Sequence, residues 1–234
     1  MMRNSLIFIV LLAFGVMIYN LYINFDGNTE LNNIAQFYAN EQNIQEVGAA
    51  NLVTAVVVTY RGLDTLGEVT ILFLTAAIIG FFLKLQLADT RSNSAKRRPS
   101  EIFDTAARVL TPIIFVFGIY VFINGHLTPG GGFQGGAIIA SSFVLMLLVG
   151  QNESFKSKLF TRIESISGVV FVFIGILGIV LAGGFLDNRI MSIGTFGTLI
   201  SAGAIPIIYI FVGLKVGSEL SNILGGFHEL QKEK

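Results

Sequence analysis

Two acidic residues and an arginine lie close together in residues 59–70, TYRGLDTLGEVT, which lead into a long apolar run. Asp64 and Glu68 are four residues apart, so they share one face of any helix that already includes Asp64. Arg61 is placed to pair with Asp64. An ionisable group at the start of a membrane helix can pass protons or cations between outside water and a path inside the protein. The spacing therefore indicates an ion-transfer role for Glu68 and Asp64.

A structural role for the same residues remains open. Residues 65–68, Thr-Leu-Gly-Glu, fit the capping-box pattern in which Glu68 accepts a hydrogen bond from the backbone of Thr65. The two roles are compatible. Lys84 lies about four helical turns further on and is a candidate for the inner end of a charge path. The preferred interpretation of Lys84 is a side chain that extends to the lipid headgroups.

Glycines are concentrated in residues 125–137, GHLTPGGGFQGGA, between two apolar segments. Pro129 fixes its own φ angle, and the triplet Gly130, Gly131 and Gly132 permits positive φ and close backbone approach. Gly132 and Gly136 are four residues apart, so one face of the helix that follows is bare enough for close helix contact. The loop is therefore predicted to be a packing element.

Three other residues of this loop have specific expectations. Phe133 is placed to wedge into a neighbouring helix, and His126 is a candidate protonation site near neutral pH. The alternative for His126 is an interfacial histidine that only contacts water. The spacing Gly130-x-Gly132-x-x-Gly135 also satisfies the dinucleotide fingerprint, which requires a preceding strand. Here the preceding segment is a candidate membrane span, so nicotinamide binding is excluded.

The composition is that of a membrane protein. Of 234 residues, 53% are hydrophobic and 13% are charged, whereas soluble domains carry about 25% charged residues. The absence of cysteine excludes disulfides, iron–sulfur ligation and thiolate zinc sites. The two histidines, His126 and His228, lie far apart, so neither a metal site nor a cofactor is expected. The net charge of zero gives no indication of nucleic-acid binding.

Six apolar segments have about the length that a bilayer-spanning helix requires, which predicts an all-α, polytopic transmembrane bundle. They are residues 5–22, 66–87, 109–123, 133–149, 166–185 and 196–214. A seventh candidate, residues 47–60, has only fourteen residues and is predicted to be a short interfacial or re-entrant helix.

The distribution of basic residues sets the predicted orientation. Arg3, the stretch 84–98, the loop 156–162 and the tail from Lys215 carry the positive charge, which gathers on the cytoplasmic side of membrane proteins. With six spans these segments all fall on one side, and a seventh at 47–60 would place basic loops on both faces. The sequence therefore predicts a multi-pass protein of the cell membrane with both termini in the cytoplasm.

A polar stretch at residues 89–100 separates two spans from four. This predicts a two-span module over residues 1–98 and a four-span module over residues 99–234, joined by a cytoplasmic linker.

The glycine loop and the RGLDTLGE stretch together resemble the Mrp-type multisubunit cation/proton antiporters. GHLTPGGGFQGGA, with four spans around it, is similar to the MnhB component of that family. The upstream AANLVTAVVVTYRGLDTLGEVTIL resembles a small component called MbhE in membrane-bound hydrogenases. The two resemblances cover most of residues 45–220. The fusion of both parts in one chain departs from the standalone MnhB protein.

The resemblance implies a non-catalytic subunit that packs in the lipid membrane beside other Mrp-type or complex-I-like antiporter subunits and contributes to a cation or proton pathway. The acidic residue of the family motif matches Glu68, and its proline and phenylalanine match Pro129 and Phe133. The parent complex is either a free-standing antiporter or a redox-driven relative with hydrogenase-type or sulfur-reducing subunits. The alternative function is a purely structural assembly subunit of such a redox-driven complex.

Overall fold

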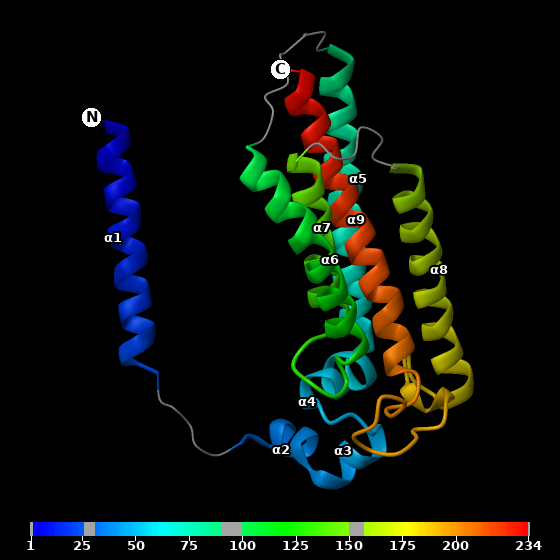
Figure 1. The fold of residues 1–234 in the computed structure, drawn as a ribbon. Helices are drawn as coiled ribbons and strands as arrows, with labels where there is room; N and C mark the ends of the chain where they lie inside the picture. The colour runs from blue at the N-terminus through cyan, green and yellow to red at the C-terminus, as the bar shows by residue number, and fades with distance from the viewer. Residues whose placement is uncertain (1, 26–30, 90–99, 150–156, 234) are drawn as a thin grey trace. The chain divides into compact units, whose positions relative to one another are not determined.

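The computed structural model describes residues 2–25, 31–89, 100–149 and 157–233, and all regular structure in these ranges is helical (Figure 1). The predicted all-α fold is confirmed. The chain divides into two compact units, Met1–Phe37 and Tyr38–Lys234. Six helices in the described ranges are long and apolar enough to cross a membrane, as predicted.

The first unit contains α1 (Met2–Ile23) and the start of α2 (Asn33–Ala39). From residue 5 onward, every side chain of α1 is exposed in this chain. A helix that is apolar on all sides is expected to be surrounded by lipid or by other protein. We therefore assign α1 as the first membrane span.

The second unit is built around α9 (Ile205–Glu233), which packs against four other long helices. Figure 1 shows α9 among them. Leucine-, isoleucine- and phenylalanine-rich faces make these helices stable in lipid, and small residues let α9 approach them closely. The four helices are α5 (Gly62–Asp89), α6 (Glu101–Ile123), α7 (Gly132–Val149) and α8 (Ser157–Ala182).

The last span differs from the prediction. It begins at Ile205 rather than at residue 196, and it runs through Lys215 to His228. Ala202 and Gly203 have φ angles of 64° and 58°, which interrupt a helix before Ile205. The expectation that the chain is a cytoplasmic tail from Lys215 onward is therefore wrong, because Lys215 lies about halfway along the span.

One end of the second unit carries short elements instead of long helices. These are α3 (Glu41–Val47), α4 (Leu52–Thr54), the π-helix η1 (Ala55–Tyr60), the glycine loop and the 3₁₀-helix η2 (Asn188–Ile190), which gather at the lower end in Figure 1. The seventh candidate segment, residues 47–60, folds here. It is not one of the spanning helices, and its Val47, Ala55 and Val58 are buried against the rest of the unit.

The predicted module boundary between residues 98 and 99 stays a prediction. The compact unit Tyr38–Lys234 includes residues from both sides of that boundary, because α5 packs directly on α9. Residues 90–99 themselves lie outside the described residues.

Candidate functional site

A set of hydrogen bonds joins the start of α4 to the glycine loop. The Asn51 side-chain amide donates to the carbonyl oxygens of Gly125 at 2.9 Å and Thr128 at 3.0 Å. The Thr54 hydroxyl donates to the same Gly125 oxygen at 2.7 Å and accepts from the Tyr209 hydroxyl at 2.9 Å. Asn51 has a further role as the N-cap of α4. The polar groups of the loop are thus bonded to residues more than seventy positions away.

The glycines of the loop provide space for α7 to contact its neighbours. A Cβ atom added to Gly132 would lie 2.7 Å from the Cβ of Val212, and one added to Gly130 would lie 2.8 Å from the carbonyl oxygen of Val121. Gly131 differs, because its φ of 155° is positive. Pro129 is exposed at the surface of the chain, whereas the half-buried Phe133 packs against the main apolar core.

His126 is fully enclosed in the same loop. Its Nε2 lies 3.4 Å from the carbonyl oxygen of Thr198, and its Nδ1 has no hydrogen-bond partner among the described residues. Burial lowers the pKa of His126, and the opposing hydrogen bonds from the backbone are the smaller effects. An imidazole that is neutral at neutral pH and enclosed on all sides favours a structural role for this residue over proton transfer.

Acidification is expected to destabilise the chain through His126. Because its pKa in the folded state lies below the unfolded value of about 6.5, the unfolded state binds the proton more readily. The free energy of unfolding should therefore fall as the pH drops below that value, until the folded pKa is passed. Thermal unfolding of wild type and His126→Gln between about pH 7 and pH 5 tests this. The variant should show the weaker pH dependence, and His228→Gln should keep the wild-type slope; equal slopes for wild type and His126→Gln would contradict it.

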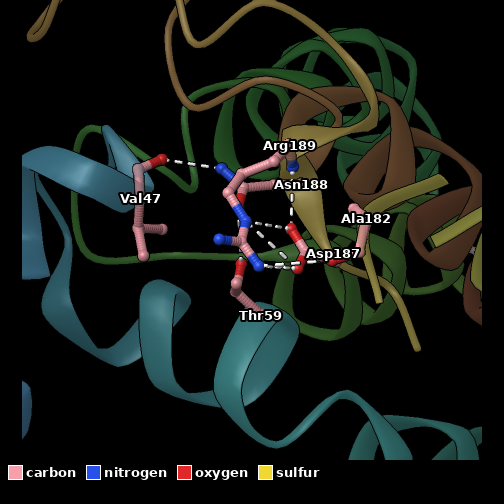
Figure 2. A network of polar contacts seen from close by, with 6 residues as sticks. All are labelled: Val47, Thr59, Ala182, Asp187, Asn188 and Arg189. Atoms are coloured by element: carbon pink, nitrogen blue, oxygen red, sulfur yellow. Dashed lines mark hydrogen bonds and ion pairs between the residues drawn. The ribbon is translucent and has the colours of Figure 1, made fainter. Parts of the chain in front are cut away.

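A second polar network lies beside the loop that joins α8 to α9 (Figure 2). The buried Asn188 amide donates to the carbonyl oxygens of Val47 at 2.7 Å and Ala202 at 3.0 Å, and its Oδ1 accepts from the Thr59 hydroxyl at 3.3 Å. This residue therefore joins three separate segments of the chain.

The neighbouring Asp187 and Arg189 form an ion pair. Burial alone would raise the pKa of the Asp187 carboxyl, but the hydrogen bonds and charge of Arg189 outweigh it and lower that pKa. Asp187 is therefore ionised at neutral pH and holds the turn that positions Asn188.

The start of α5 changes the interpretation of the acidic constellation. The helix begins at Gly62, so Thr65 lies inside it and is not the residue that caps it. The Thr65 hydroxyl instead donates to the Val57 carbonyl oxygen of η1 at 2.6 Å. The capping-box interpretation is therefore wrong, because the helix starts one turn earlier than the apolar pattern indicates.

The predicted ion-path residues are not brought into one cluster. Asp64 pairs with Arg61 on the exposed side of α5, and Glu68 is exposed one turn further along. Glu68 is close enough to Tyr209 to act on it electrostatically. Lys84 lies more than four turns from Glu68, or about 24 Å along the helix. The placement of the Lys84 side chain is outside the described part of the structure.

Sequence reasoning missed a buried ion pair within α9. Lys215 Nζ lies 3.2 Å from Glu219 Oε2 and 5.0 Å from the centre of the Phe73 ring on α5. Glu164 of α8 lines a groove of about 620 Å³ together with Lys215 and Phe73. The signal was the spacing of four between Lys215 and Glu219, which places them on one helix face. It was overlooked because Lys215 was assigned to a tail.

Relatives of this chain include one that matches about three quarters of its length. An uncharacterized protein of Methanocaldococcus jannaschii is 31% identical over 194 residues, which cover 73% of this chain and 74% of the relative. The MnhB-type component of the Na⁺/H⁺ antiporter of Bacillus subtilis is 34% identical over 96 residues. That match covers 41% of this chain and 65% of the B. subtilis protein.

Two solved structures resemble the whole chain. One is a chain of the membrane-bound sulfane sulfur reductase, an archaeal respiratory membrane complex, with 38% identity and a TM-score of 0.78, covering 97% of this chain and 98% of that chain. The other is a chain of the Mrp complex from Dietzia sp. DQ12-45-1b, with a TM-score of 0.76. It covers 99% of this chain and 26% of that chain at 22% identity, so it shows a likeness of fold alone.

Two families account for most of the sequence. Residues 2–95 match the MbhE family, a component of the MBH complex. Residues 102–222, more than half of the chain, match the family described as a domain related to the MnhB subunit of the Na⁺/H⁺ antiporter. With its helical fold and six spans, the chain therefore belongs to the MnhB-related family of membrane proteins.

Proposed function

We propose that this chain is a membrane subunit of a multisubunit Na⁺/H⁺ antiporter-type complex, in which it contributes to a cation or proton pathway and to assembly. The match of residues 102–222 to the MnhB-related family, on a fold with six spans, is the observation that carries this proposal. The proposed subunit has no catalysis of its own. Its orientation follows the basic residues, which places both termini in the cytoplasm.

A second candidate is a structural subunit of a redox-driven membrane complex. It is favoured by the likeness to a chain of the sulfane sulfur reductase, which is matched over 98% of its length at 38% identity. The two candidates differ in their partners. Mild solubilisation of the native membrane and identification of the co-purifying proteins distinguishes antiporter subunits alone from antiporter and redox subunits together.

Within this proposal, Glu68 is the residue that exchanges ions. It lies six residues after Gly62, about 9 Å into the span, on the exposed side of α5. A carboxylate that faces only hydrocarbon at this depth is costly. We therefore infer that a partner subunit covers this face of α5 and supplies a polar surface or a water-filled path opposite Glu68.

Replacement of this carboxylate by an amide tests the proposal. Glu68→Gln keeps the shape of the side chain but removes its exchangeable charge, so the complex should assemble with unchanged subunit content while antiport in membrane vesicles falls close to the level without the complex. Glu101→Gln is the matched control, since Glu101 is an exposed carboxylate at the start of α6, and it should retain antiport.

Full antiport by an assembled Glu68→Gln complex would refute the transport role of Glu68. Loss of the complex in Glu68→Gln, with Glu101→Gln intact, would favour the structural function instead.

A further inference from the structure

Three ionisable side chains lie in the membrane-spanning part of the second unit. Lys215 and Glu219 are on α9, with side chains 7% and 0% exposed, and they form the ion pair already described. Glu164 is on α8 and accepts a hydrogen bond from the Asn222 side-chain amide at 3.0 Å. These residues are separate from Glu68, which is on the exposed side of α5.

The cluster has an excess of negative charge. Two carboxylates share one ammonium group, so full ionisation leaves a net charge of minus one within the bundle. The charged groups that act on the Glu219 carboxyl are Lys215 and Glu164. The neighbouring helix α5 contributes the Phe73 ring, and α7 contributes Gly136 against Gly217, so neither balances the charge among the described residues. An uncompensated charge inside a membrane bundle is unfavourable.

The same turn of α9 lacks a hydrogen-bond donor. Glu219 Oε1 and Asn222 Oδ1 are buried, and within the described residues neither oxygen has a hydrogen-bond partner. The two residues are three positions apart, so their side chains are neighbours on the helix surface. A proton on Glu219 would add the missing donor and cancel the excess charge at once.

We propose that Glu164, Lys215 and Glu219 form a proton-binding site within the membrane, in which Glu219 takes up one proton. A proton requires only one carboxylate oxygen. A metal cation requires several oxygen ligands, and here it would be repelled by the Lys215 ammonium 3.2 Å from Glu219 Oε2. The site therefore selects a proton over sodium.

Polar groups connect this site with one end of the bundle. Asn222 bonds to Glu164 and lies 3.5 Å from the Thr161 hydroxyl, measured from Nδ2 to Oγ1. Glu164 and Thr161 are both within about two turns of Ser157, where α8 begins. The proton is exchanged at this end, which is the cytoplasmic end in the orientation proposed above. The use of the site in transport rests on the proposed function, but proton binding does not.

Infrared spectroscopy of the purified full chain in lipid nanodiscs tests proton binding directly. The C=O stretch of a protonated carboxyl should be present at neutral pH in wild type and should lose the intensity of one carboxyl per chain in Glu219→Gln. Glu101→Gln, which changes an exposed carboxylate, should leave the band unchanged. Addition of sodium chloride at constant pH should also leave it unchanged. In Lys215→Met, the band should persist to more alkaline pH, because the ammonium no longer favours the ionised form.

An unchanged band in Glu219→Gln would overturn the proposal, and a band that disappears on addition of sodium would show a cation site instead. If Glu219→Gln does not fold, ¹³C-glutamate labelling of wild type replaces it: a neutral-pH band that does not shift on labelling does not come from a glutamate and would also overturn the proposal. None of these measurements depends on antiport, so failure of the Glu68 prediction leaves this test intact.

Discussion

Gly136→Val is expected to disrupt the packing of α7 on α9 and to prevent recovery of an intact complex. A Cβ atom at Gly136 would lie 2.8 Å from the carbonyl oxygen of Gly213, 2.8 Å from the Cβ of Val216 and 3.0 Å from the backbone nitrogen of Gly217. Two of these three atoms belong to helix backbone, which cannot turn aside as a flexible side chain does. Overpacking of this kind costs about 1–3 kcal/mol or more. Thermal unfolding of the purified chain and native gels of the complex measure the effect.

Gly80→Val is the matched control. Gly80 lies within α5, and no described atom lies within 4 Å of the position of an added Cβ. Valine has a slightly better helix propensity than glycine, so this variant should unfold at or slightly above the wild-type temperature. Equal unfolding temperatures for Gly80→Val and Gly136→Val would show that close helix contact is not the reason for the glycine at position 136.

The fold could be predicted from the sequence as far as long apolar runs define it. All six spans were predicted because each run reaches the length that lipid requires. The beginnings of helices were less accessible. The start of α5 at Gly62 depends on a single turn at Arg61 after the π-helix η1, and no apolar periodicity marks that turn. For the same reason the capping role assigned to Thr65 and Glu68 was wrong.

The extent of α9 was missed for an electrostatic reason. Lysine near the end of an apolar run usually marks the cytoplasmic boundary, so Lys215 was assigned to the tail. In the structure Glu219 lies one turn further on and partly compensates its charge, which allows both residues inside the span. The spacing of four was visible in the sequence, but its meaning depends on knowing that the helix continues.

Contacts of the glycine face show the same division between local and long-range information. The spacing of Gly132 and Gly136 predicted a bare helix face but not its partner. Gly213 and Gly217 repeat that spacing on α9, and the structure places this second bare face against Gly136. A single sequence contains both patterns without stating that they meet. Hydrogen bonds such as that of Asn188 with Val47, which spans 141 positions, leave no local pattern at all.

Asn188→Leu is expected to have the largest effect on stability of any single side-chain replacement at the loop end of the second unit. The change removes the donors that satisfy the buried carbonyl oxygens of Val47 and Ala202 and the acceptor of the Thr59 hydroxyl. Each buried polar group that loses its partner costs about 1–3 kcal/mol. The free energy of unfolding should therefore fall by about 3 kcal/mol or more, as measured by thermal or denaturant unfolding of the purified chain.

Two further variants separate hydrogen bonding from a general effect of the substitution. Asn20→Leu makes the same change at an exposed residue of α1, whose amide bonds only to the Val16 carbonyl of its own helix among the described residues, and it should be nearly neutral. Asn188→Asp keeps an acceptor for Thr59 but removes both donors and adds a buried charge, so it should be at least as harmful as leucine. A stable Asn188→Asp chain would show that the carbonyl oxygens of Val47 and Ala202 do not depend on this amide. The joining of segments 47, 59 and 202 would then have to come from apolar packing alone.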